Sequence, residues 1–265
     1  MFMYSEEQLL YLKRIKRNKL LIFLTQILIF IILVTLWELL ARLKLINTFL
    51  FSSPGDIIKT IINLHKNNDL YPHILITIYE TTISFTLATI IGAIIATIFW
   101  WNNFIAKVIA PYLTILNSLP KVALGPIIII WVGANANSII LMALLISTFI
   151  TIINLYDGFI NYDENQIRLL KSFKATKKDI YFKAILPGSL PNIINTLKIN
   201  VSMSLIGVIM GELLVSKKGL GYLIMYGSQV FNLNLIMTGI IILALVAFIM
   251  YYLVCCLEKK VSKQI

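Results

Sequence analysis

The stretch "RLLKSFKATKKDIYFKAILPGSLPNII", residues 168–194, is a long basic segment that ends in two prolines and lies between two apolar runs. The chain around it is strongly apolar: 59% of its 265 residues are hydrophobic, 13% are charged, and the mean hydropathy is +0.88. Soluble domains are about half apolar and about a quarter charged. The composition therefore predicts an integral membrane protein, in which this stretch is a loop outside the bilayer.

Six segments reach the length of a membrane-crossing helix, which takes about 20 mainly apolar residues. They are residues 20–40, 74–101, 105–132, 139–156, 193–215 and 235–257. The predicted fold class is an all-α integral membrane protein with six transmembrane helices. Residues 1–19 form a basic amino terminus, residues 20–257 the transmembrane domain with its long loop at about 157–192, and residues 258–265 a tail.

Lys and Arg number 23 against 12 Asp and Glu, which gives a net charge of +11. Nucleic-acid binding would also explain such a charge, but membrane proteins keep Lys and Arg in cytoplasmic loops. With a cytoplasmic amino terminus, the inner side receives the cluster Lys13 to Lys19, Lys107, Arg168, Lys171, Lys174, Lys177, Lys178, Lys183, Lys259, Lys260 and Lys263. The outer side receives Arg42, Lys44, Lys59, Lys66, Lys217 and Lys218. We therefore expect both termini and the basic stretch in the cytoplasm, and no nucleic-acid partner.

The third span is interrupted by three prolines, Pro111, Pro120 and Pro126, which break the helical hydrogen-bond ladder. Non-helical backbone at membrane depth is tolerated only where it is buried in protein or lines a cavity. Lys121 is likewise costly if it meets lipid. We expect this span inside a helix bundle, near a translocation path or an interface.

Small residues recur at helical spacing in the fifth span, at Ser204, Gly207 and Gly211, and in the second, at Gly92 and Ala96. This pattern lets helix backbones approach closely. It fits helix packing within the chain, and it equally fits a subunit interface or a pore. The spacing of these small residues alone does not distinguish packing within the chain from a subunit interface or a pore.

Three acids lie within or beside the predicted spans. Glu38 has Arg42 four residues later, a favourable helical pair. Glu80 and Glu212 have no basic residue within one helical turn, and an intramembrane acid without an evident partner is a candidate functional residue. The candidate translocation-path residues are therefore Glu80, Lys121, Ser204 and Glu212. The sequence offers no catalytic or metal site, because the two cysteines, Cys255 and Cys256, are adjacent at the end of an apolar run.

Two short helices are predicted around the opening stretch. In the first, Asp163 is the N-cap with Gln166 three residues later, and Leu169, Leu170 and Phe173 share one apolar face. An exposed apolar patch rimmed by charge marks a protein contact. A helix lying on the lipid surface, held there by lysines, explains the pattern equally well.

The second helix begins at a capping box, Thr176 with Asp179, and we expect it to stop at Pro187. Lys174 and Ala175 form the turn between the two helices.

The segment resembles the "EAA" loop of ABC-importer permeases: Glu-Ala-Ala, three residues, Gly, nine residues, an aliphatic, any residue, then Leu-Pro. Aligned on Pro187, the family's Glu falls at Arg168 and its Gly at Lys174. The first departure removes the acid that would pair with a basic residue of the ATPase. The second predicts a turn without the left-handed backbone that glycine permits. The resemblance implies an ATPase-docking segment made of Arg168, Leu169, Leu170, Phe173, Lys174, Ala175, Thr176 and Pro187.

Four further stretches are similar to the branch of this family that imports taurine, sulfonates, nitrate and some vitamin precursors. They are "LWELLAR" at 36–42, "SSP" at 52–54, "LPKVALGPIIIIWVG" at 119–133 and "GELLVSKKGLGYLI" at 211–224. The resemblance implies a type I ABC importer permease fold in a bacterial inner membrane. It also implies a second permease subunit, expected to be a second copy, together with ATPase subunits, an extracytoplasmic binding protein and surrounding lipid.

The chain has no G-x-x-x-x-G-K-[ST] phosphate loop, so ATP and magnesium are expected in the partner ATPase and no cofactor in this chain. Where much of the sulfonate and nitrate branch has Arg in a "T-L-x-R-x-x-x-G-F" pattern, this chain reads "TIYETTISF", with Glu80 at that position. A carboxylate facing the path would disfavour an anion. This favours a neutral or cationic heterocycle, such as a pyrimidine or flavin-type vitamin precursor, over sulfonate, taurine or nitrate.

Two other functions remain open from the residues alone. An ion-coupled secondary transporter would use intramembrane acids, but such proteins often carry inverted repeats with matching broken helices, and only the third span is broken here. A non-transporting membrane scaffold or sensor would leave the docking loop unexplained.

Overall fold

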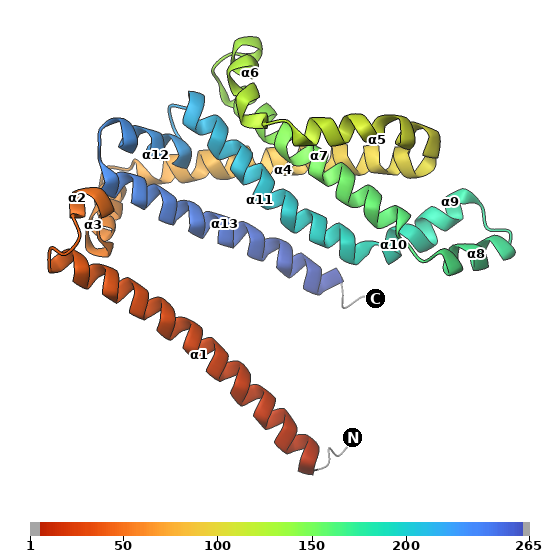
Figure 1. The fold of residues 1–265 in the computed structure, drawn as a ribbon, viewed down its shortest axis with the longest axis horizontal. Coiled ribbons are helices and arrows are strands. Elements are labelled where there is room, and N and C mark those ends of the chain that lie inside the picture. Colours follow the sequence, from red (N-terminus) through yellow and green to blue (C-terminus); the bar gives the residue numbers. More distant parts are fainter. Residues whose placement is uncertain (1–5, 262–265) are drawn as a thin grey trace.

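The computed structural model describes residues 6–261, which fold as helices joined by short loops (Figure 1). The helices are α1 (Glu6–Arg42), α2 (Thr48–Phe51), α3 (Pro54–Lys66), α4 (Leu70–Trp101), α5 (Asn103–Ser118), α6 (Gly125–Val132), α7 (Ala136–Ile160), α8 (Glu164–Ser172), α9 (Lys177–Ile180), α10 (Leu186–Gly188), α11 (Leu190–Val215), α12 (Leu220–Gln229) and α13 (Leu233–Val261). A 3₁₀ turn covers Lys121–Leu124 and a π turn covers Tyr181–Ile185. The predicted tail residue Lys263 lies outside the described residues.

Five helices are long and apolar enough to cross a membrane: α1 from Tyr11, α4, α7, α11 and α13. The predicted third span is a bent pair, α5 and residues 121–132, whose two arms meet at 84°. The break falls at Leu119 and Pro120, because the residue before a proline avoids helical geometry and Leu119 is extended. Pro111 is accommodated inside α5, and Pro126 lies in the first turn of α6. The predicted all-α membrane fold is confirmed.

The centre of the bundle is the packing of α7 against both α4 and α11 (Figure 1). Glycines allow this close approach. A Cβ added at Gly207 would lie 2.4 Å from the Cα of Ala143, and one at Gly92 would lie 2.5 Å from the Thr151 side chain. Gly211 similarly abuts Ile139. These small residues therefore pack helices within one chain.

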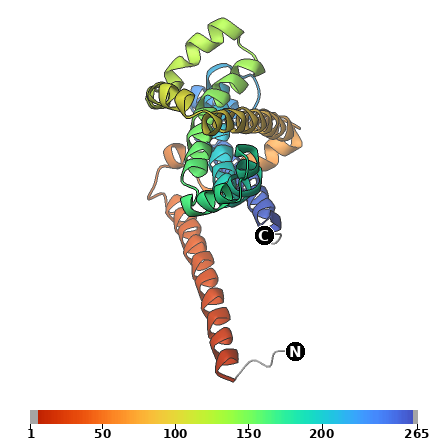
Figure 2. The ribbon, with the colours of Figure 1, turned by 90° about the vertical axis from the view of Figure 1, so that its right-hand side faces the viewer.

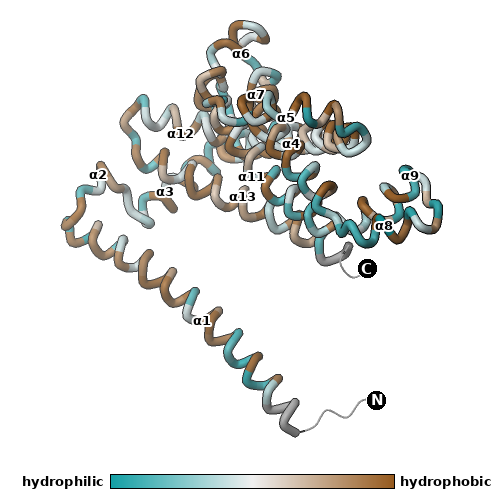
Figure 3. Tube along the Cα trace, turned by 45° about the vertical axis from the view of Figure 1, so that its right-hand side comes forward, coloured by the Kyte–Doolittle hydropathy of each residue, from teal (hydrophilic) through white to brown (hydrophobic). Residues whose placement is uncertain are grey.

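Helix α1 leaves the bundle and is exposed along its length, with its carboxyl end meeting α3 (Figure 2). Its surface is apolar over most of the span and hydrophilic near the amino end (Figure 3). The expected pair forms: Arg42 Nε donates to Glu38 Oε1 at 2.7 Å, and the Gly55 N–H donates to Glu38 Oε2 at 2.9 Å. An apolar helix of this length, with no partner along its middle in the described chain, requires lipid or another protein chain around it.

The bundle has two distinct ends (Figure 1). The "α12 end" comprises α12, α3, the start of α4 and the end of α11. The "α8 end" comprises α8, α9, the end of α4 and the start of α11. Helix α4 joins the two, since its His73 contacts Gly219 at one end and the carbonyl of Trp101 contacts Lys177 at the other.

Candidate functional site

Helix α8 is capped at its start as predicted, but the contact differs in detail. The Asp163 side chain accepts from the N–H of Asn165 at 2.9 Å. Gln166, predicted to reach back to the cap, instead accepts a hydrogen bond from the Tyr162 hydroxyl. The helix start is therefore fixed locally, and Tyr162 joins it to the loop that follows α7.

The three apolar residues of α8 do not share one face. Leu169 and Phe173 are 58% and 74% exposed, whereas Leu170 packs inward with Ile167 against a buried cluster that includes Tyr181. The prediction of a common face was wrong for Leu170, because neighbouring residues of a helix point about 100° apart and its inner side is already covered. The exposed apolar patch is therefore Leu169 with Phe173.

Lys174 adopts a left-handed backbone with φ +58°, so the prediction of a turn without that conformation was wrong. The N–H of Lys174 bonds to the carbonyl of Lys171 at 2.9 Å, and the N–H of Ala175 bonds to that of Leu170 at 3.1 Å. This pair of bonds is a Schellman motif, which requires a left-handed residue just past the helix end. The hydrogen bonds of the turn thus outweigh the preference of a lysine for a negative φ, and Lys174 occupies a position suited to glycine.

Arg168, at the position of the family's Glu, is paired within its own helix. Its guanidinium donates to Glu164 Oε2 at 2.8 Å, and both side chains are exposed. An exposed pair of this kind contributes little to stability. Lys171 and Lys174 are the exposed lysines next to the apolar patch in the chain.

The second half of the loop begins at the predicted capping box. The Asp179 N–H donates to Thr176 Oγ1 at 3.1 Å, and the Thr176 N–H donates to Asp179 Oδ2 at 3.3 Å. Lys183 forms an ion pair with Asp179 at 2.6 Å. The Lys183 ammonium, followed by the Thr176 bonds, lowers the pKa of the Asp179 carboxyl to about 2. Asp179 is therefore ionised, as its capping role requires.

The helix does not stop at Pro187, contrary to the prediction. A π turn over Tyr181–Ile185 precedes it, and the chain stays helical to Gly188. The N–H of Leu186 bonds five residues back to Tyr181. The wider turn shifts the hydrogen-bond register just where proline lacks a donor, so the helix continues through it.

Two contacts tie this loop to the end of α4. The Lys177 ammonium donates to the carbonyl of Trp101 and lies 5.6 Å from the ring centre of Trp100. The Tyr181 hydroxyl and Thr97 Oγ1 are hydrogen-bonded at 2.7 Å. A cation at a helix carboxyl terminus is favourable, and one over an indole ring adds to this. The sequence gave no sign of this link, whose partners lie about 80 residues apart.

At the α12 end, the structure brings together the two intramembrane acids. Glu80 on α4 and Glu212 on α11 are both buried, and Glu80 lies one helical turn from Thr77, which contacts Glu212. Thr77 donates to Glu212 Oε1 at 2.6 Å, and the Gly221 N–H donates to Glu212 Oε2 at 2.5 Å. The Leu220 N–H in turn donates to Thr77 Oγ1 at 2.9 Å. We call this set, Thr77, Glu80, Glu212 and the backbone of Gly219 to Tyr222, the acid junction.

Gly219 is the position of the acid junction where both the backbone conformation and the available space favour glycine. Its φ of +114° lies where side chains are rarely accepted, and a Cβ there would lie 2.3 Å from Glu212 Cδ. Its N–H donates to His73 Nδ1 at 2.9 Å. The tight loop thus carries backbone donors directly onto Glu212.

The other two predicted path residues lie elsewhere. Ser204 is buried on α11, two turns from Glu212, beside Asn200, whose side-chain amide donates to Thr89 Oγ1 at 2.7 Å. Lys121 donates to the Asn117 carbonyl at 2.9 Å, at the break in the third span. The structure therefore places Glu80 near Glu212 and leaves Ser204 and Lys121 apart from them. Their assignment to a path stays a prediction.

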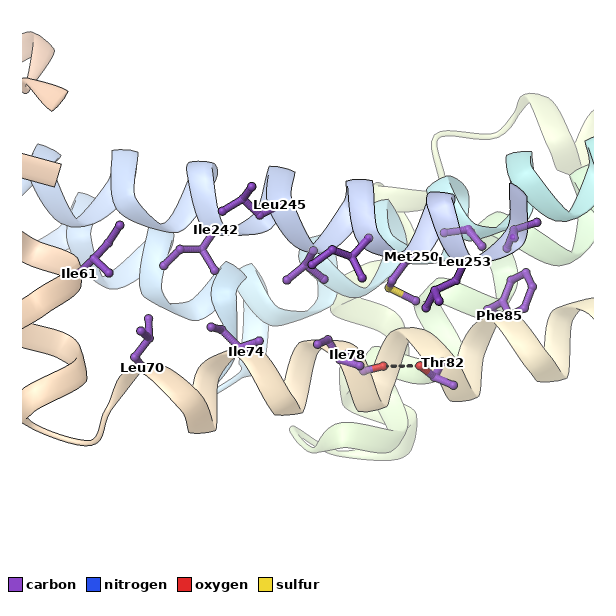
Figure 4. A pocket seen from close by; sticks show the side chains of 14 residues that line it. Ile61, Leu70, Ile74, Ile78, Thr82, Phe85, Ile242, Leu245, Met250 and Leu253 are labelled. Carbon is purple, nitrogen blue, oxygen red and sulfur yellow. Dashed lines mark hydrogen bonds between the residues drawn. The ribbon is translucent and has the colours of Figure 1, made fainter. Parts of the chain in front are cut away.

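A groove between α4 and α13 has a volume of about 600 Å³ (Figure 4). Its walls are aliphatic side chains such as Ile74, Ile78 and Ile242, with Phe85. The hydroxyl of Thr82 is already bonded to the Ile78 carbonyl. A solute site needs placed polar groups among its apolar walls, so this groove suits lipid or helix contacts. Among residues 6–261, no three His, Cys, Asp or Glu side chains are grouped to hold a metal ion.

Comparison with known proteins identifies the family to which this helical bundle belongs. A family model described as the binding-protein-dependent transport system inner membrane component matches residues 88–263. The chain belongs to this family. It is a multi-pass inner-membrane permease subunit of an ABC importer, and members of the family translocate solute without being enzymes themselves.

Relatives of the permease span two kinds of cargo. A formylaminopyrimidine transport permease protein, ThiX of Halalkalibacterium halodurans, is 28% identical over 74% of this chain and 77% of its own length. A protein named as a candidate aliphatic sulfonates transport permease, SsuC of Bacillus subtilis, is 27% identical over 88% of this chain and 84% of its own. The permease of the MetNI methionine ABC transporter, solved in inward-facing conformations, shares the fold with a TM-score of 0.65 at 18% identity, over 72% of this chain and 95% of its own.

Proposed function

We propose that the permease imports a small organic solute in a complex whose ATPase subunits dock on the α8 to α10 loop from the cytoplasm. The exposed pair Leu169 and Phe173 carries this proposal. These side chains are apolar and exposed, lie outside the membrane-spanning helices, and are flanked in the chain by the exposed Lys171 and Lys174, as at a protein-contact surface. The concentration of Lys at the α8 end supports a cytoplasmic position for it and for both termini.

The chemistry of the docking surface defines its partner. Burying a Leu or Phe side chain contributes about 1.5 to 3 kcal/mol to the free energy of association. Leu169 and Phe173 together can therefore hold the permease in an apolar groove of the ATPase. Arg168 is engaged by Glu164, which leaves the neighbouring lysines to meet acidic groups of the partner. ATP and magnesium are bound by that ATPase, and an extracytoplasmic binding protein supplies the solute.

For transport, movement of the docked loop must be transmitted to the membrane-spanning helices. The contacts of Lys177 and Tyr181 with the end of α4 supply a direct connection, and α4 continues to the acid junction. ATP-driven closure of the ATPase dimer would then pull the paired loops together and rock the spans from inward-open to outward-open. Such coupling requires the ATPase states to contact the loop differently. We further propose that the second permease is a copy of this chain, since closed two-fold symmetry is the commonest arrangement.

For the solute, we propose a pyrimidine-type vitamin precursor, with an alkanesulfonate as the second candidate. Glu80 adds no support to this choice, because its side chain is buried in the bundle and only 2% exposed. The likeness to a formylaminopyrimidine permease supports the first candidate, and the likeness to SsuC supports the second. Thermal-shift measurement of the cognate binding protein with both ligand classes decides between them. Stabilisation by sulfonates alone would reject the first.

The docking proposal is tested with Phe173→Asp. A charge in place of the anchor should abolish co-purification of the cognate ATPase while the permease still inserts and folds. Phe231→Asp is the matched control: Phe231 is 73% exposed but lies at the opposite end of the bundle, after α12. Its left-handed backbone, φ +52°, is one that Asp tolerates. Full ATPase binding by Phe173→Asp would contradict the proposed docking surface.

A further inference from the structure

The acid junction contains an unusual pairing of two carboxyl groups inside the membrane part of the permease. Glu80 and Glu212 are 2% and 1% exposed, and Glu80 lies one helical turn from Thr77, whose hydroxyl donates to Glu212. The two acids are more than 100 residues apart in the chain, but their helices, α4 and α11, pack together. An ionised carboxylate has only acceptor atoms, so two neighbouring buried carboxylates repel each other, and a proton on one of them relieves that repulsion.

The surroundings decide which group is ionised. Glu212 accepts from the Thr77 hydroxyl and from the backbone N–H group of Gly221. A carboxylate with several donors is stabilised in its charged form. Glu80 accepts from none of these donors, and its Oε2 is buried with no hydrogen-bond partner. A charged Glu80 would therefore be desolvated and uncompensated, while a neutral Glu80 avoids this cost.

No cation in the described residues neutralises the pair. Neither acid takes part in a salt bridge between residues 6 and 261. Several titratable groups lie on the elements packed around the pair. Near the α12 end these are His73, which is bonded to Gly219, Tyr222 and Tyr226 on α12, and Lys217 and Lys218 in the loop before α12. Toward the other end they are Asp157 on α7, Lys198 on α11, and Glu258 with its neighbours on α13, where Lys198 and Glu258 form an ion pair. The two loop lysines line a separate hollow with Asp69 and His73.

We propose that Glu80 and Glu212 form a proton-binding site that holds one proton at neutral pH, with Glu80 as the neutral acid and Glu212 as the carboxylate. The proton replaces a counter-cation and holds α4 to α11 and to the loop before α12. On deprotonation, the Glu80 proton leaves to solvent and two buried carboxylates remain close together. Their repulsion in a water-poor site separates α4 from α11.

The sign of the pH effect follows from proton counts. A glutamate in the unfolded chain has lost its proton well below pH 7. The folded permease holds one more proton than the unfolded chain at neutral pH, so its stability falls as the pH rises. Glu80→Gln is neutral like the protonated acid and has no proton to lose.

Infrared spectroscopy of the purified permease in lipid tests the site. At pH 7 the wild type should show the carbonyl stretch of a protonated carboxylic acid, shifted in D₂O, and Glu80→Gln should lack that band. Glu164→Gln, which removes an exposed carboxylate, should keep the band unchanged. Absence of the band in the wild type, or its full persistence in Glu80→Gln, would overturn the proposal.

A second measurement uses the wild type alone and stands even if Glu80→Gln fails to fold. The band should disappear reversibly as the pH is raised, and the melting temperature should fall by several degrees over the same interval. Where Glu80→Gln folds, its melting temperature should vary less with pH in that range. A band that vanishes with no change in melting temperature would contradict the role of the proton in holding the helices together.

Discussion

The two ends of α4 use the same residue types in opposite ways. At the α12 end, Glu212 is buried and surrounded by donors from Thr77 and the backbone of Gly221, so its charge holds elements of one chain together. At the α8 end, Glu164 and Arg168 are exposed and pair only with each other. Buried polar groups must be satisfied within the chain, whereas exposed ones remain available to a partner.

This difference implies different responses to substitution. Changes at the α12 end should act on folding and stability, because its acids are buried and Glu212 is bonded to other parts of the same chain. Changes at the α8 end should act on association and coupling, with modest effects on the folded permease. The predictions below test this division, beginning with the largest expected effect.

Gly219→Ala should destabilise the permease more than Gly133→Ala. Both glycines have positive φ, +114° and +91°, so both substitutions carry backbone strain. Only at Gly219 would the new methyl meet a packed group, 2.3 Å from Glu212, whereas at Gly133 the nearest atom is 3.1 Å away on Asn135. We expect an extra loss of about 1 to 3 kcal/mol from overpacking. Thermal unfolding in detergent measures it, and equal melting temperatures would contradict the fit described for Gly219.

Lys177→Met should weaken the link between the docking loop and α4. The variant keeps the apolar stem but loses the charge at the Trp101 carbonyl and over Trp100, which together contribute about 1 kcal/mol. We expect near-normal ATPase binding with less transport per ATP hydrolysed. Lys178→Met, one residue away and exposed, is the control and should keep normal coupling. Identical coupling ratios in the two variants would exclude Lys177 as a mechanical contact.

Lys174→Gly should stabilise the turn after α8. A non-glycine residue in left-handed geometry costs about 1 to 2 kcal/mol, part of which glycine returns as extra entropy of the unfolded chain. The expected net gain is up to about 1 kcal/mol, measured as slower hydrogen exchange of the Ala175 amide. Lys171→Gly, inside the helix, should have the opposite effect. Faster exchange in Lys174→Gly would argue against the Schellman geometry.

The capping box should respond only to strong acid. The pKa of Asp179 is lowered from its ordinary value of 3.8 to about 2, chiefly by Lys183. Its contribution to stability is therefore complete above about pH 4 and is lost as the pH falls toward 2. Hydrogen exchange near Thr176 in wild type and Asp179→Asn should differ at neutral pH and converge in acid. A difference that persists at pH 2 would show that ionisation of Asp179 is not the cause.

The features that the sequence predicts correctly are local. Apolar runs of sufficient length mark the spans, and short-range patterns such as Thr176 with Asp179 mark helix starts, because each depends on residues within a turn or two. The break in the third span follows from Pro120 for the same reason. These signals require no knowledge of what packs where.

The features that the sequence misses depend on tertiary contacts. Glu212 has no evident partner along its own helix, because its hydrogen bonds come from Thr77, 135 residues away on α4, and from the backbone of Gly221 beyond a tight loop. Leu170 points inward because it packs against a buried apolar cluster. Lys174 adopts a left-handed backbone because the hydrogen bonds of Lys174 and Ala175 to the end of α8 require it. In each case, tertiary packing determines a partner, a side-chain direction or a backbone conformation that the local sequence pattern leaves open.

The most direct test of the central claim is solute uptake by proteoliposomes that contain the permease and its cognate ATPase, with the binding protein outside. Uptake should require ATP and the binding protein, should be retained by Phe231→Asp, and should be abolished by Phe173→Asp. Uptake that persists without ATP and follows a proton gradient, or full uptake by Phe173→Asp, would contradict an importer driven through the exposed face of α8.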